Sequence, residues 1–280
     1  MAFAYLGILG PLRLKIGKIE AAPSGAKLRN ILVVLAIRAD NGVRRDELID
    51  ELGLIKTTGH AVNALHAHIA RLRRWLARHG ACDLLETDHS GYRLTIDRSA
   101  VDAHRFADQV ERALKLAPAT PSVVAAMLEE ALGLWRGDAL LDALDGPMAA
   151  AAAAELHRLR DAARATILDA WISLDYNQKV ILNARKFIAE DPLNEPIRTR
   201  HIVALQRMGR YAEAVESYKS AEQVLMEELG IEPGRELRQA AAEMGVVCNF
   251  CRSDSHWDRH GGCVCERGGQ MAWISARMGA

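Results

Sequence analysis

The chain has 280 residues, of which half are hydrophobic and only 5% aromatic, and its acidic and basic side chains are equal in number. That length can bury two ordinary cores, and the abundance of Ala, Leu and Arg favours helices over an all-β fold. No apolar run is long enough to cross a membrane, and residues 1–9 lack the features of a secretion signal. We therefore expect a cytoplasmic protein with no membrane partner.

The neutral total hides an uneven distribution of charge along the chain. Residues 1–97 contain 14 Lys and Arg against 10 Asp and Glu, whereas residues 98–245 contain 18 against 23. A basic segment followed by an acidic one favours contact with nucleic acid through the first segment alone. Chance fluctuation is the alternative, because the difference between the two segments is not large.

The first fifty residues predict a small sheet followed by two helices. Short apolar and alternating runs at 5–9 and 12–16 are separated by turn residues, which is typical of an antiparallel sheet. A helical period then runs through 28–36, with Ser24 as the expected N-cap. A shorter helix is expected over 45–52.

A third helix, expected from Thr58 to His79, carries the functional argument. Its predicted apolar stripe, at spacings of 3, 4, 3 and 4, consists of Val62, Leu65, Ile69, Leu72 and Leu76. The rest of its surface is small and polar in the N-terminal half and basic in the C-terminal half. Small polar side chains can approach base edges and arginines hold phosphates. The residues predicted to contact bases are Thr58, His60, Asn63 and His66, and those predicted to contact phosphates are Arg71 and Arg74.

Two β-runs, at 84–87 and 92–96, flank a glycine-containing loop and predict a hairpin. A hairpin directly after a basic helix is the wing of a winged helix, with Arg93 as its expected DNA contact. The alternative for the preceding helix is an ordinary amphipathic helix with a solvated basic face. The order of sheet, three helices and hairpin favours a DNA-binding domain over residues 1–97.

Residues 98–245 predict an all-α domain. Pro118 and Pro121 separate one helix from the next, and long amphipathic stretches run through 122–134 and 148–173. A weak repeat of about 34 residues follows, in which the turns at 174–175 and 208–209 correspond. Its packing positions are Ala184 and Phe187 in one copy, and Tyr218 and Ala221 in the other. Tetratricopeptide-like helix pairs of this kind form concave surfaces for peptides, proteins or a sister protomer; a bundle without a groove is the alternative.

Five runs match a known family in order and without large gaps: Leu9–Leu12, Asn63–Arg74, Gly91–Leu94, Leu132–Gly137 and Glu228–Gly234. Over about residues 3–245 the chain resembles the Streptomyces antibiotic regulatory proteins. The resemblance implies an OmpR-like winged helix and a bacterial transcriptional activation domain. It also implies binding to direct repeats in promoters and activation of secondary-metabolite gene clusters. Residues 52–56 depart from the family pattern, because its usual Trp-Gly-Asp-type turn and following proline are missing.

The overall expectation is a mainly α fold with small β elements: an N-terminal winged helix-turn-helix followed by an all-α tetratricopeptide-like repeat domain. The motifs of phosphate-binding loops, dinucleotide sites, serine hydrolases and zinc proteases are missing, so we do not expect an enzyme.

The tail, residues 246–280, contains four of the five cysteines. Two cysteines separated by two residues can share one tetrahedral Zn²⁺ with two ligands from a later turn, and metal binding suits a reducing cytosol better than disulfides. The predicted ligands are Cys248, Cys251, Cys263 and Cys265, with His256 and His260 as alternates. The other interpretation is a divergent extension without metal, or one read from a shifted frame.

The leading hypothesis is a nucleoid-associated activator that binds double-stranded promoter DNA as a homodimer on direct repeats and contacts RNA polymerase holoenzyme. A rival hypothesis is a helical-repeat scaffold whose winged helix mediates protein contacts only. A third is a small-molecule sensor with its ligand in the repeat domain. Salt-dependent binding to duplex DNA separates the first two, because only contact with phosphates releases counterions.

Overall fold

The computed structural model describes residues 4–39, 41–54, 60–143 and 145–242, together with the backbone of two strands, β7 (Gly262–Cys265) and β8 (Ala272–Ser275). The chain divides into two compact units, Met1–Ala163 and Arg164–Ala280. Within the described residues, none of the helices is both long enough and apolar enough to span a bilayer.

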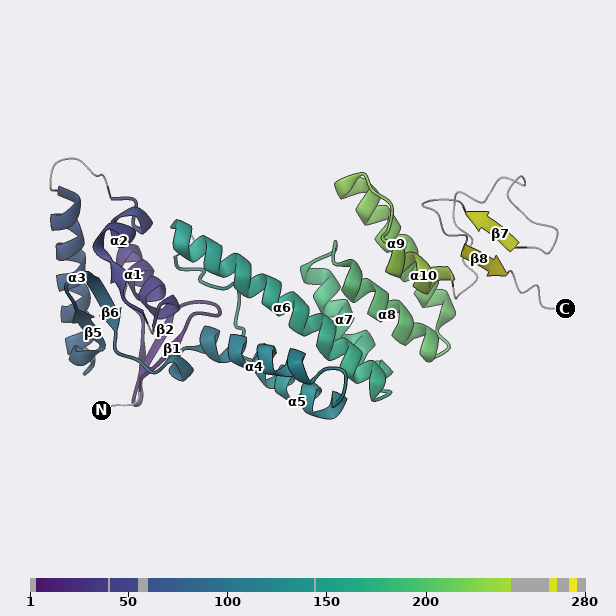
Figure 1. The fold of residues 1–280 in the computed structure, drawn as a ribbon, viewed down its shortest axis with the longest axis horizontal. Coiled ribbons are helices and arrows are strands. Elements are labelled where there is room, and N and C mark those ends of the chain that lie inside the picture. Colours follow the sequence, from purple (N-terminus) through teal and green to yellow (C-terminus); the bar gives the residue numbers. More distant parts are fainter. Residues whose placement is uncertain are drawn as a thin grey trace. The chain divides into compact units, whose positions relative to one another are not determined.

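The first unit begins with a small sheet, three helices and a hairpin (Figure 1). In chain order these elements are β1 (Ala4–Gly7), β2 (Arg13–Ile16), β3 (Ile19–Ala21), α1 (Ala26–Ile37), β4 (Val43–Arg44), α2 (Arg45–Glu51), α3 (His60–Arg78), β5 (Leu85–Thr87) and β6 (Gly91–Leu94). Strands β1, β2 and β3 form an antiparallel meander, and the second sheet has the order β4-β6-β5. This is the predicted winged helix, with the strands and helices in the predicted order.

Helix α1 lies at the centre of the winged-helix core, since its residues from Asn30 to Ala36 are all buried. The predicted N-cap at Ser24 is wrong, because the cap is Gly25 and no side chain caps the helix. The extended Gly25 carbonyl accepts the first helical N–H bonds, whereas the Ser24 carbonyl accepts a bond from the Arg29 guanidinium. The N-terminus of α1 is therefore stabilised by the backbone carbonyls of Gly25 and Ser24, and not by the Ser24 hydroxyl.

Helix α3 packs on this core through a stripe of five buried residues, Ala61, Leu65, Ile69, Leu72 and Leu76. Four of these were predicted, but Val62 was wrongly placed in the stripe, because its side chain is 39% exposed. With 3.6 residues per turn, Ala61 and Val62 lie on opposite sides of the stripe at equal angles from its centre, and the helix packs with the Ala61 side inward. Val62 therefore belongs to the flank of the helix and remains accessible.

The first unit continues into helices α4 (Asp102–Leu116), α5 (Pro121–Leu132) and α6 (Pro147–Ser173), the last of which runs across the limit between the two units. Helices α4 and α5 pack together through residues that are almost completely buried: Phe106, Val110, Val124 and Leu128. Pro121 begins α5, as the predicted break between two helices requires.

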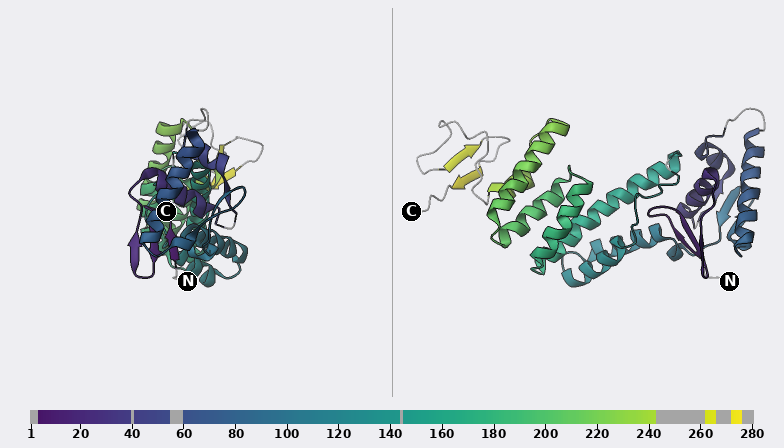
Figure 2. Two further views of the ribbon diagram at one scale, coloured as in Figure 1. Left: turned by 90° about the vertical axis from the view of Figure 1, so that its left-hand side faces the viewer. Right: turned by 180° about the vertical axis from the view of Figure 1, so that it is seen from behind.

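The second unit contains α7 (Asn177–Glu190), α8 (Glu195–Arg207), α9 (Tyr211–Leu229) and α10 (Arg235–Ala242), and Figure 2 shows the consecutive helices side by side. The two predicted repeat turns correspond in geometry, since Asp175 and Gly209 both have positive φ, 58° and 71°. The predicted packing positions Ala184 and Tyr218, which are 34 residues apart, are both buried, and Ala221 is completely buried where the other copy has a half-buried Phe187. The tetratricopeptide-like character of this region is thereby confirmed.

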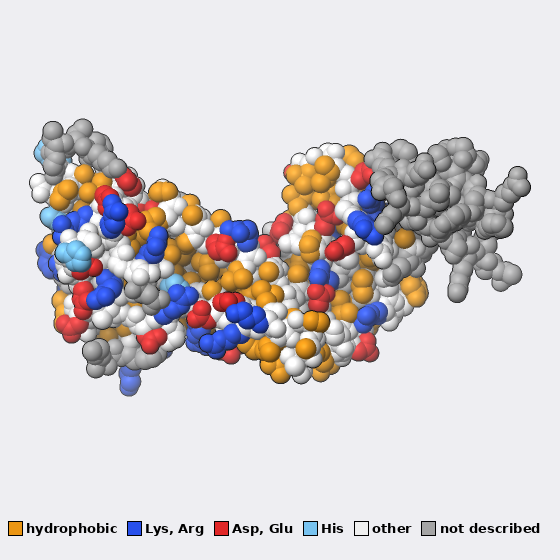
Figure 3. Space-filling view, in the orientation of Figure 1, with side chains coloured by type: hydrophobic (Ala, Val, Ile, Leu, Met, Phe, Trp, Pro, Cys, Tyr) orange, Lys and Arg blue, Asp and Glu red, His pale blue; other side chains and the backbone are white. Residues whose placement is uncertain are grey.

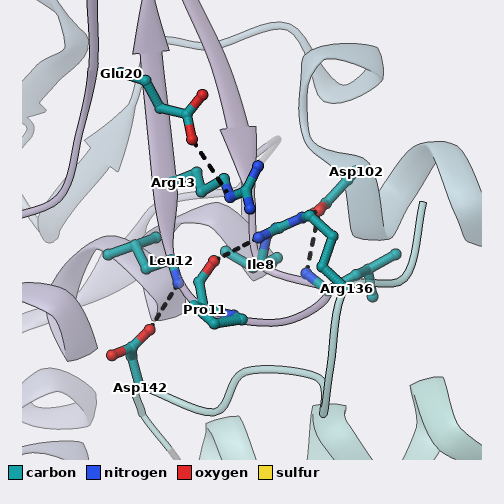
Figure 4. A network of polar contacts seen from close by, with 9 residues as sticks. Ile8, Pro11, Leu12, Arg13, Glu20, Asp102, Arg136 and Asp142 are labelled. Carbon is teal, nitrogen blue, oxygen red and sulfur yellow. Dashed lines mark hydrogen bonds and ion pairs between the residues drawn. The ribbon is translucent and has the colours of Figure 1, made fainter.

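Within the first unit, a buried carboxylate ties the N-terminal sheet to α4 (Figure 4). The fully buried Asp102 side chain accepts hydrogen bonds from the backbone N–H groups of Ile8, at 2.7 Å, and Leu9, at 3.1 Å. The Arg136 guanidinium lies 3.2 Å from the same carboxylate and donates to the Pro11 carbonyl at 2.7 Å. Burial raises the pKa of Asp102, although all three donors to the carboxylate act in the opposite direction.

Two further carboxylates join other segments of the first unit. Asp142 accepts a hydrogen bond from the backbone N–H of Leu12 at 2.6 Å. Glu51, at the end of α2 and only 2% exposed, accepts the backbone N–H groups of Met148 and Ala149 at 2.7 and 3.0 Å. Glu51 thus satisfies donors that the first turn of α6 would otherwise leave unpaired.

The connection between the hairpin and α4 is short and structured. It contains one 3₁₀ turn, Arg98–Ala100, and Val101 pairs with Leu6 of β1 in a parallel bridge. The boundary expected between residues 97 and 98 consequently falls inside the first compact unit.

Candidate DNA-binding surface

The exposed face of α3 has the composition predicted for a DNA-reading helix. Between His60 and Arg78, all of which the structure describes, the helix has no acidic residue. The exposed residues of its N-terminal half are His60, Val62, Asn63, His66, Ala67 and Ala70. Those of its C-terminal half are Arg71, Arg73, Arg74, Ala77 and Arg78. Histidine and basic side chains accordingly gather over this part of the first unit in Figure 3.

The structure brings together three of the four residues predicted to contact bases. His60, Asn63 and His66 are exposed at intervals of three along the helix, so their side chains are neighbours on one face. Thr58 lies outside the described residues. Partial burial and the charges of Arg71 and Lys27 lower the pKa of His68, a half-buried residue of the same helix.

The arginines of α3 divide into two groups by their contacts. Arg71 and Arg74 are exposed, and the Arg74 Nε donates weakly to the carbonyl of Ala70 at 3.4 Å. Arg73, which sequence reasoning did not single out, donates to the hydroxyl of Thr87 on β5. Arg73 therefore links the helix to the hairpin, a role for which the sequence contains no local signal.

The hairpin presents less positive charge than its sequence suggests. Arg93 lies on β6 rather than at the tip, and it forms an ion pair of 2.7 Å with Glu86, its partner in the strand register. The tip itself contains Asp88, whose pKa is lowered to about 2 by hydrogen bonds from the Ser90 hydroxyl and from the backbone N–H groups of Gly91 and Ser90. The wing thus presents one paired arginine and a carboxylate that stays ionised at neutral pH.

Most of the predicted metal ligands lie outside the described residues: Cys248, Cys251, His256 and His260. Cys263 and Cys265 lie on β7, for which only the backbone is described. Within the described ranges, no group of three or more potential ligands is arranged to hold a metal ion.

The zinc site in the tail therefore stays a prediction. We expect full-length protein purified without added zinc to contain about one equivalent of Zn²⁺, because the six candidate side chains supply one tetrahedral ligand set. Elemental analysis measures this ratio directly. A ratio near zero would contradict the prediction, as would a ratio that does not fall when Cys248 and Cys251 are replaced by serine.

Residues 101–244 match the family model described as Bacterial transcriptional activator domain. Transcriptional regulator RedD of Streptomyces coelicolor is 34% identical over 243 residues, which are 85% of this chain and 69% of RedD. The chain belongs to the Streptomyces antibiotic regulatory protein family. This confirms the family that the five sequence runs indicated.

Other members and neighbours agree with this assignment to the antibiotic regulatory proteins. Regulatory protein DnrI of Streptomyces peucetius is 27% identical over 266 residues, which cover 91% of this chain and 95% of DnrI. A solved structure of Mycobacterium tuberculosis EmbR in complex with a low-affinity phosphopeptide matches with a TM-score of 0.78 and 27% identity, over 87% of this chain and 65% of that one. The likeness confirms a winged helix followed by a helical domain, and the chain is a transcriptional regulator.

Proposed function

We propose that this regulator binds duplex promoter DNA by placing α3 in the major groove. The observation that carries the proposal is the exposed face of α3, which is small and polar in its first half, rich in arginine in its second half, and free of acidic residues along its length. B-DNA's major groove admits a helix, and its phosphates attract the basic half.

Each half of the helix has its own role in this arrangement. His60, Asn63 and His66, with Thr58 just before them, contact base edges, because their side chains both donate and accept hydrogen bonds. Arg71 and Arg74 contact phosphates, which position the helix without reading sequence. Arg93 is a weaker phosphate contact, since it must exchange Glu86 for the DNA backbone.

The rest of the proposed function follows from the family and from the small size of the winged-helix domain. One α3 reads only a few base pairs, so we propose that two protomers bind direct repeats in the promoter. The acidic helical domain then contacts RNA polymerase holoenzyme and activates a secondary-metabolite gene cluster in the cytoplasm. The net charges of residues 1–97 and 98–245 differ by nine. The first segment is basic, which suits contact with DNA, and the second is acidic, which suits contact with a protein partner.

Replacing Arg71 with alanine tests the phosphate assignment. We expect weaker binding to all duplexes alike and a salt slope of log K that flattens by about one, because one phosphate contact is lost. The measurement is a titration of labelled duplex at several salt concentrations. The matched control is Arg112→Ala, since Arg112 is exposed on α4, away from the α3 surface.

Two outcomes would contradict this assignment. Wild-type affinity in Arg71→Ala would exclude Arg71 as a phosphate contact. If the unmodified protein binds no duplex in a salt-dependent manner, the winged helix has no DNA function, and the rival hypothesis of a protein-interaction scaffold stands instead.

A further inference from the structure

Val62 is unusual among the apolar residues of the winged helix because its side chain is exposed. In the described part of residues 4–97, only Ile19 and Val62 are exposed large hydrophobic residues. Ile19 lies on β3, in the N-terminal sheet, whereas Val62 lies in the first turn of α3, next to Asn63. The Val62 isopropyl group is only partly covered by the protein, and it lies on the helix that we propose to enter the groove.

The major groove offers one base-edge group that matches such a side chain. The C5 methyl of thymine is the apolar feature there, and it accepts contact from apolar side chains. Asn63 has complementary chemistry, since an asparagine amide can donate to adenine N7 and accept from adenine N6. Helix α3 has no Asp or Glu to accept the N4 hydrogens of cytosine.

The spacing of the two residues also fits neighbouring base pairs. The Cα atoms of consecutive residues lie about 3.8 Å apart, and successive base pairs are separated by about 3.4 Å. Consecutive side chains leave the helix about 100° apart, so the two approach the edges of different base pairs. Val62 and Asn63 can therefore contact adjacent base pairs at the same time.

We propose that Val62 and Asn63 make the first turn of α3 specific for two adjacent A·T base pairs. Val62 packs against the C5 methyl of a thymine, and the Asn63 amide forms the two hydrogen bonds to the adenine of the neighbouring pair. This inference rests on the proposed insertion of α3 into the major groove, and it names the bases that the N-terminal half of the helix prefers.

The test removes the C5 methyl from the DNA and the two methyl groups of Val62 from the protein in turn. Preferred sites are first selected from a random duplex library with the full-length protein. Each thymine of a selected site is then replaced by deoxyuridine, which keeps base pairing but lacks the C5 methyl, and Kd is measured for the unmodified protein and for Val62→Ala. The matched control is Val123→Ala, because Val123 is 47% exposed but lies on α5.

We expect one uracil position to weaken binding of the unmodified protein and of Val123→Ala about fourfold, the factor for one buried methyl-sized group. The same substitution should have no effect on Val62→Ala. Asn63→Ala should lose about tenfold in its preference for adenine at the adjacent pair. The salt slope should be the same for all of these proteins, because the phosphate contacts of the arginines remain.

Each contrary result overturns a different statement. If no uracil position affects the unmodified protein, or if the effect persists in Val62→Ala, Val62 does not read a thymine methyl. If Asn63→Ala keeps the adenine preference, the paired reading is wrong. In all three cases a persisting salt slope shows that DNA binding itself stands, whereas salt-independent behaviour with every duplex overturns the proposed function together with this inference.

Discussion

Replacing Asp102 with alanine is expected to lower the free energy of unfolding of the first unit by about 3 kcal/mol. The backbone N–H groups of Ile8 and Leu9 would lose their acceptor in a buried place, and each unsatisfied donor costs about 1–3 kcal/mol. Arg136 would also lose its carboxylate. For a unit of this size the loss corresponds to a fall of roughly 10 °C in Tm.

Thermal and urea unfolding measure this change, and hydrogen exchange of peptides locates it. We expect faster exchange around Ile8 and Leu9, with no change in α7 to α9. The matched control is Asp138→Ala, because Asp138 is an exposed carboxylate of the same unit. A melting curve of Asp102→Ala that coincides with that of the control would show that the carboxylate does not hold the sheet to α4.

Inserting five base pairs between the proposed half-sites is expected to abolish cooperative binding. Two copies on direct repeats lie on the same face of the duplex when the repeats are about 10–10.5 base pairs apart, and half a turn moves one copy to the opposite face. Binding to a single half-site should keep its affinity. Gel-shift titrations of duplexes with one or two half-sites measure both quantities.

The control for this prediction is an insertion of one full turn. That insertion returns both copies to the same face, so part of the cooperativity should reappear. Cooperativity that survives both insertions unchanged would mean that the protomers bind independently, and the head-to-tail arrangement would then be wrong.

The helices and strands of the winged helix were predictable because hydrophobic period reports directly on burial. The prediction failed where two neighbouring residues are both compatible with the stripe, as with Ala61 and Val62. It also failed at Ser24, because side-chain preference at a cap cannot show that the backbone of Gly25 occupies the cap position. Both errors concern one residue at the edge of an element.

The polar contacts could not be predicted from the sequence, for a different reason. Asp102 and Ile8 lie 94 residues apart, and neither has a periodic pattern that points to the other. The ion pair of Arg93 with Glu86 was within reach, since a hairpin with its loop at Asp88–Ser90 places these two residues opposite each other. For the exposed face of α3, composition along one helix was sufficient, and no tertiary information was needed.

The hydrogen bonds of Asp102, Asp142 and Glu51 within the first unit have a consequence for the promoters that we propose for this regulator. A DNA-binding domain on a flexible linker would bind repeats at many separations, because the linker can change its end-to-end distance. Here the winged-helix domain belongs to one compact unit with helices α4 and α5. Each base pair added to the spacer turns a bound copy by about 36° around the duplex. Promoters with two sites should therefore diverge in the sequence of the spacer much more readily than in its length.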